Sequence, residues 1–236
     1  MNNHPIEYLN SGGLFLLSFA ISFVNIFSID FNEVREFMGS IEEVGITTGA
    51  LGILLVLSIS YPLGYLINAA SFQILRQLRS RVYSQFNATL PPKVKSDLVS
   101  IYQYKVGDKD VYQISMDGFQ SLDNEGIYLN LIKIHLLTLC ADSYSRANAV
   151  WITRTRFFRL FSTSCLFSFT LLIISYVSSF PLYQYNRTGD IISNITIGMM
   201  SILFILTLIN MYLYYIYLKM ECDSFLARYL TVTNRI

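Results

Sequence analysis

The chain alternates between long uncharged runs and short charged segments. Four runs contain no Asp, Glu, Lys, Arg or His, and they cover residues 8–29, 44–75, 160–186 and 191–218. These runs are 22, 32, 27 and 28 residues long, and a helix of about 20 apolar residues crosses the hydrocarbon core of a bilayer. The pattern predicts an all-α integral membrane protein with four transmembrane helices, at about residues 12–29, 46–66, 160–180 and 192–217.

The segment between the second and third runs predicts a mostly helical insertion. Residues 73–90 read as an amphipathic helix that ends at Pro91 and Pro92, because proline breaks a helix interior. We also expect a short helix over 94–104, a short strand or extended loop over 111–116, and a long helix from Gly126 through Arg159 that leads into the third span. Pro62 and Gly64 predict a kink or break near the inner end of the second span.

Charge then orients the predicted spans. Charged residues make up 14% of the chain, against about 25% in soluble domains, and the net charge of +1 gives no field that indicates nucleic acid. Residues 76–159 carry 12 Lys or Arg and 7 Asp or Glu, and a Lys/Arg excess marks the cytoplasmic side. We therefore expect a first hairpin at 1–75, a cytoplasmic region at 76–159, a second hairpin at 160–218 and a cytoplasmic tail at 219–236. Both termini would be cytoplasmic, in a bacterial inner membrane.

Small residues form a stripe along each predicted span. Gly45, Gly49 and Gly52 share one face of the second span, and Ser164 and Ser168 share one face of the third. Small residues let membrane helices approach closely, so the favoured interpretation is helix packing, within the chain or between subunits. The alternative is that serine and asparagine stripes line a pore, in a constitutive ion channel or small-solute carrier.

Candidate chemistry is sparse. Because the runs hold no ionisable residue, proton-coupled transport and voltage sensing are disfavoured. On the predicted helix, His135 and Asp142 share a face but Cys140 lies off it, so a Cys–His catalytic pair is poorly placed. Two histidines and three scattered cysteines give no zinc spacing. We expect no catalytic residue, no cofactor and no metal.

Basic residues gather where the chain enters and leaves the predicted membrane: Arg76, Arg79, Arg81, Arg154, Arg156 and Arg159. They favour contact with anionic headgroups, with a phosphate-bearing partner such as a nucleotide signal or nucleic acid, or an acidic cytoplasmic protein, as the alternative. A region of about 84 residues buries only a small core alone, which favours a homo-oligomer. The general plan resembles that of small bacterial membrane proteins that act as sensors or effectors in antiviral defence and nucleotide signalling. That resemblance implies a non-enzymatic protein that couples cytoplasmic recognition to the membrane.

Overall fold

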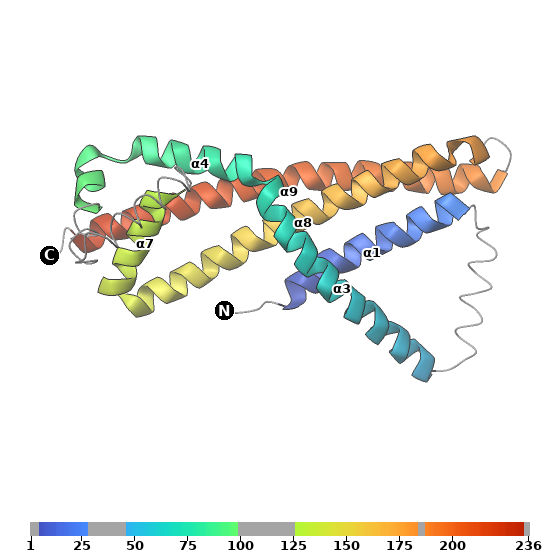
Figure 1. The fold of residues 1–236 in the computed structure, drawn as a ribbon, viewed down its shortest axis with the longest axis horizontal. Helices are drawn as coiled ribbons and strands as arrows, with labels where there is room; N and C mark the ends of the chain where they lie inside the picture. The colour runs from blue at the N-terminus through green and yellow to red at the C-terminus, as the bar shows by residue number, and fades with distance from the viewer. Residues whose placement is uncertain (1–4, 28–45, 99–125, 184–186, 234–236) are drawn as a thin grey trace, which may run out of the picture. The chain divides into compact units, whose positions relative to one another are not determined.

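The computed structural model describes residues 5–27, 46–98, 126–183 and 187–233, and the regular structure in these ranges is all helical. The helices are α1 (Pro5–Phe27), α3 (Ile46–Ile74), α4 (Arg76–Thr89), α7 (Ile127–Leu139), α8 (Ala141–Tyr183) and α9 (Arg187–Thr233), and residues 92–98 are also helical (Figure 1). Four of them contain stretches long and apolar enough to cross a membrane: Ile6–Phe23, Leu54–Ile74, Tyr144–Ser178 and Asn194–Thr233. The all-α prediction and the four candidate spans are confirmed for the described residues.

The chain divides into two compact units. Unit 1 comprises residues 1–74 and 157–211, and unit 2 comprises residues 75–156 and 212–236. Helices α8 and α9 therefore each give one part to unit 1 and the other part to unit 2.

In unit 1, α1 and α3 cross closely in antiparallel directions. A Cβ added at Gly12 would overlap the carbonyl group of Ser60, and one added at Gly64 would overlap the backbone of Tyr8. The ring of Tyr8 packs edge-on against the rings of Tyr61 and Tyr65, with centroids 5.7 and 6.2 Å away. Glycine is thus needed at both positions, since small residues are what allow helix backbones to approach this closely.

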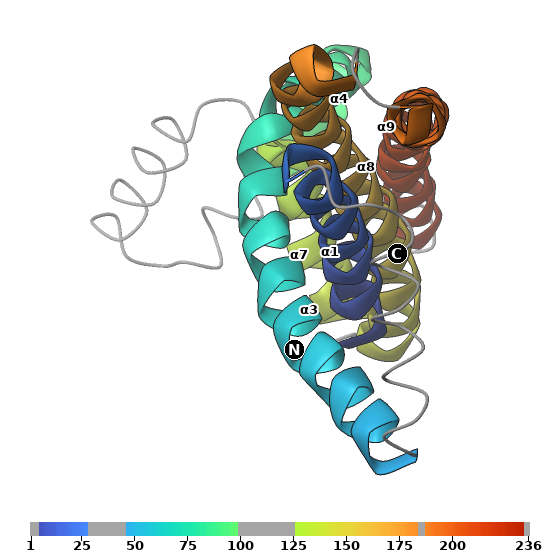
Figure 2. The same cartoon turned by 90° about the vertical axis from the view of Figure 1, so that its right-hand side faces the viewer.

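Helix α1 also packs against α8, in the same direction. The Ser164 hydroxyl donates a hydrogen bond of 2.6 Å to the Ser11 carbonyl, and the Ser175 hydroxyl donates one of 3.2 Å to the Ser22 carbonyl. Both pairs are separated by 153 residues, so the two helices keep one register over three turns. Figure 2 shows α1 with α3 on one side and α8 on the other.

The structure contradicts a break at Pro62, one of the two alternatives predicted there, and it contradicts the single helix from Gly126 to Arg159. Helix α3 continues through Pro62 to Ile74 and stops only at Leu75, whose φ of −93° and ψ of 11° leave the helix. Proline is tolerated within apolar spans because local adjustments satisfy the freed carbonyl, and Gly64 instead serves the contact with α1. The expected single helix from Gly126 to Arg159 is broken at Cys140, with φ of −146° and ψ of 59°.

The break at Cys140 separates two helices that each bury apolar side chains in unit 2. Helix α7 buries Leu129, Ile132 and Leu136, whereas the part of α8 in unit 2 buries Ala147. The Cys140 N–H still bonds to the Leu136 carbonyl at 2.9 Å, so the chain leaves helical geometry for one residue only. The predicted amphipathic helix over 73–90 corresponds to α4. The predicted strand at 111–116 and the end of the predicted helix over 94–104 lie outside the described residues.

Candidate ligand pocket and basic residues

The described part of unit 2 has a core of apolar side chains that includes a largely buried ion pair. Val82 and Phe86 of α4 and Phe225 of α9 are each at most 5% exposed. The Lys133 ammonium of α7 pairs with the Glu221 carboxylate of α9, and it also lies 4.8 Å from the centroid of the Phe225 ring. A charge removed from water is stable only with such partners. This pair therefore ties α7 to α9.

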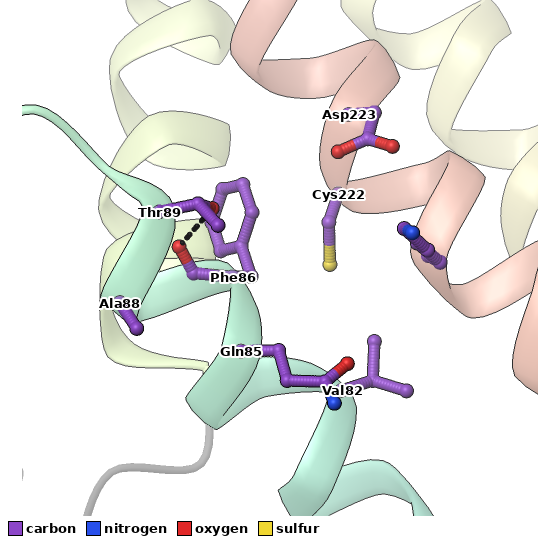
Figure 3. Close-up of a pocket in the computed structure, with 8 residues that line it drawn as sticks. Val82, Gln85, Phe86, Ala88, Thr89, Cys222 and Asp223 are labelled. Atoms are coloured by element: carbon purple, nitrogen blue, oxygen red, sulfur yellow. Dashed lines mark hydrogen bonds between the residues drawn. The ribbon is translucent and has the colours of Figure 1, made fainter.

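A pocket of about 370 Å³ opens between α4 and α9. Its lining residues are Val82, Gln85, Phe86, Ala88, Thr89, Lys219, Cys222 and Asp223. In Figure 3 the side chains from α4 face Cys222 and Asp223 from α9. The pocket falls within the size range of about 300–1,000 Å³ that is usual for small-molecule sites.

The pocket has an apolar floor and a polar rim. Val82, Phe86 and Cys222 are buried, whereas Lys219 and Asp223, one turn apart on α9, are exposed. The hydroxyl of Thr89 donates a hydrogen bond to the Phe86 carbonyl within α4, at 2.9 Å. The arrangement suits a small amphipathic molecule, with an apolar body on the floor and polar groups at the rim.

Gln85 of the pocket lining is hydrogen-bonded to α9, and Tyr83 lies two residues before it on α4. The Tyr215 hydroxyl donates to the Gln85 Oε1 at 3.4 Å. Burial, and after it the Glu221 carboxylate, raises the pKa of the Tyr83 phenol. Tyr83 is therefore a neutral group at physiological pH, and it adds no charge to the site.

A second, smaller pocket of about 230 Å³ lies at the helix break. It is lined by Leu136, Cys140, Tyr144, Ala227, Arg228, Thr231 and Val232. Two residues considered for catalysis make contacts within unit 2. The centroid of the His135 ring lies 5.4 Å from that of the Tyr229 ring, and the Cys140 thiol donates a hydrogen bond to the Leu136 carbonyl at 3.2 Å. Asp142 is exposed in the first turn of α8. Among the described residues, no group of three or more His, Cys, Asp or Glu is placed to hold a metal ion.

The structure divides the basic residues that the sequence grouped together. Arg76, Arg79, Arg81, Arg154 and Arg156 belong to unit 2, and Arg159 belongs to unit 1. Arg159 is held within unit 1: its guanidinium donates to the Asn68 Oδ1 at 2.7 Å and lies 3.5 Å from the Phe72 ring centroid. Arg159 thus links α8 to α3 within unit 1.

The residues predicted for helix packing also separate. Ser164 and Ser168 are completely buried in unit 1. Gly52 is exposed, and a Cβ added there would meet no described atom within 4 Å. Gly49 lies in α3, and Gly45 is outside the described residues.

Sequence reasoning missed the contacts that join distant helices. Lys133 with Glu221, and Asn68 with Arg159, are 88 and 91 residues apart. One signal was available: Lys133 is the only Asp, Glu, Lys or Arg between Gly126 and Leu139, and a lone charge on an apolar helix requires a partner. Comparisons with protein-family models, with curated proteins and with solved structures found no match for this chain.

Proposed function

We propose that this chain is a non-enzymatic, multi-pass membrane protein that binds a small amphipathic ligand in unit 2 and transmits binding to its membrane spans. Unit 2 would lie in the cytoplasm, in agreement with its excess of Lys and Arg. The observation that carries the proposal is the continuity of α8 and α9, each of which supplies residues to both units. A shift of α9 at the pocket therefore has a covalent path into its apolar span.

The directions of the helices support the proposed topology. Helix α3 runs antiparallel to α1, whereas α8 runs parallel to α1. If all three cross the bilayer, the chain between α3 and α8 returns on the side from which α1 started. The N-terminus of α1, the C-terminus of α3 and the N-terminus of α8 are then on the same face of the membrane.

Burial of the serine stripes favours this proposal over a constitutive channel. Ser11, Ser18 and Ser22 of α1 are at most 2% exposed, as are Ser164, Ser168 and Ser175 of α8. In this arrangement the two stripes face protein, so they do not line an aqueous path within the chain. Interhelical hydrogen bonds between such residues contribute about 0.6 kcal/mol each.

A pocket-filling substitution tests the coupling without knowledge of the ligand. In a background without native cysteines, Ser22→Cys and Ser175→Cys form a disulfide whose rate reports on the α1–α8 contact. Ala88→Trp fills the pocket, and Gln77→Trp, at an exposed position of α4 outside the pocket, is the matched control. We expect Ala88→Trp to change the disulfide rate severalfold and Gln77→Trp to leave it unchanged. The coupling is refuted if the disulfide forms at the same rate in the cysteine pair alone, in the pair with Ala88→Trp and in the pair with Gln77→Trp.

The orientation has its own test. A single cysteine at Asp142, which is exposed in unit 2, should react with a membrane-impermeant maleimide in inside-out vesicles and be protected in right-side-out vesicles. The reverse pattern would place unit 2 outside the cell and remove the cytoplasmic ligand from the proposal.

A further inference from the structure

Two aromatic rings hold the guanidinium of Arg154 in unit 2. Its Cζ atom lies 5.9 Å from the ring centroid of Trp151, one turn earlier on α8, and 5.8 Å from that of Tyr217 on α9. The two rings are themselves in contact, with centroids 6.4 Å apart and planes inclined by 57°. Attraction between a cation and aromatic faces thus restricts the position of this exposed side chain.

The N–H donors of Arg154 have no acceptor in the part of the chain that the structure describes. Among the described residues, Arg154 has no hydrogen-bond or ion-pair partner, in contrast to Arg159, which donates to Asn68. A guanidinium presents five donors in a planar fork that matches the oxygens of a phosphate. Arg154 therefore combines a restricted position with donors that no described residue uses, which is the arrangement expected of an anion-binding arginine.

All three residues lie near the ends of uncharged runs. Arg154 precedes the run that begins at Leu160 by six residues, which is about 9 Å along a helix. Tyr217 is the penultimate residue of the run that ends at Leu218. Trp and Tyr are enriched at the headgroup level of membranes, where their rings meet both apolar and polar surroundings.

We propose that Trp151, Arg154 and Tyr217 form a binding site for the phosphate group of an anionic phospholipid. The guanidinium fork contacts the phosphate oxygens, and the two rings lie against the glycerol backbone and the upper acyl chain. The site rests on the membrane location of the proposed function, but it is independent of the pocket between α4 and α9.

Trp151 provides the test because it is the only tryptophan of the chain. The full chain is reconstituted in phosphatidylcholine vesicles that contain either brominated phosphatidylglycerol or brominated phosphatidylcholine, at equal mole fractions, with bromine near the headgroup end of the acyl chain. Bromine quenches tryptophan only at close range. We expect phosphatidylglycerol to be enriched roughly fivefold beside Trp151, the factor for one basic residue at an anionic surface, and hence to quench more strongly.

Substitutions connect the quenching to the site. Arg154→Gln should abolish the difference between the two brominated lipids, whereas Arg81→Gln, which changes another exposed arginine of unit 2, should preserve it. Equal quenching by both lipids in the wild type, or an unchanged difference in Arg154→Gln, would overturn the proposal.

Two further arms separate the possible outcomes. Inorganic phosphate is added to detergent-solubilised protein: an emission change that Arg154→Gln removes, with no lipid preference in vesicles, would identify free phosphate as the ligand and overturn the lipid assignment. Flotation with vesicles and resistance to alkaline extraction measure membrane insertion directly. If the protein neither floats with vesicles nor resists alkaline extraction, the membrane location itself is contradicted. If it inserts but shows no lipid preference, only the proposed lipid site is contradicted.

Discussion

Replacing Gly64 with alanine tests the close crossing of α1 and α3. The added Cβ would overlap the backbone of Tyr8, and a backbone group cannot rotate away as the end of a side chain can. The two helices must therefore separate. A gap of about 0.5–1 Å removes roughly a quarter to a half of the attraction in each contact that opens, and overpacking of this kind costs about 1–3 kcal/mol.

Gly52 offers a matched control on the same helix. It is exposed, and the alanine Cβ would meet no described atom within 4 Å. Alanine also has a higher helix propensity than glycine, by up to about 1 kcal/mol. Gly52→Ala should thus leave the stability unchanged or raise it slightly, and the difference between the two variants isolates the crossing from any general effect of alanine.

Thermal unfolding of the purified full-length variants in detergent measures this difference. In a domain of about 150–250 residues, 1 kcal/mol shifts the melting temperature by about 2–4 °C, so Gly64→Ala should lower it by roughly 2–12 °C relative to Gly52→Ala. Equal melting temperatures for the two variants would show that α1 and α3 do not meet at Gly64, and the packing described for unit 1 would then be wrong.

Three further substitutions probe unit 2. Gly126 has a φ of 79°, and an added Cβ would lie 3.0 Å from the Tyr83 ring, so Gly126→Ala should cost at least about 1–2 kcal/mol in thermal unfolding; a variant as stable as the wild type would contradict this conformation. Glu221→Gln leaves the largely buried Lys133 ammonium without its carboxylate partner, and this should lower the stability by about 3–5 kcal/mol. A Lys133→Met, Glu221→Leu double variant should recover most of that stability. If the double variant is no more stable than Glu221→Gln, the unpaired Lys133 charge is not the cause of the loss. Burial, followed by the Glu221 carboxylate, raises the pKa of Tyr83 above 10, so its contribution to stability is complete below about pH 10 and is lost as the pH rises further. Tyr83→Phe should therefore lose less stability than the wild type between about pH 9 and 11, and identical pH profiles would refute this.

The helical architecture could be predicted from the sequence because it depends on one-dimensional properties. Charge is absent from four stretches that are long enough to span a bilayer, and each stretch contributes to a helix that meets the length and hydropathy of a span. Pro91 and Pro92 likewise placed the end of α4 within a residue of Thr89. The sequence could not decide matters that depend on packing in three dimensions. Pro62 left a kink and a break open, and it stays inside α3 without a break; the prediction failed at Cys140, where no glycine or proline marks the break.

The contacts of the candidate sites depend on register between helices, which single-helix periodicity does not contain. Six arginines looked equivalent in the sequence, yet their neighbours separate them. Arg159 is occupied by Asn68 and Phe72, whereas Arg154 lies against two aromatic rings with its donors unused among the described residues. The same reasoning applies to the serines of α1 and α8: periodicity alone did not show what the two stripes contact, whereas the hydrogen bond from Ser164 to the Ser11 carbonyl shows that they contact each other. Because a charge or hydroxyl is available to a ligand only when its own chain leaves it unused, the neighbours of these residues, more than their positions along the chain, decide where binding occurs.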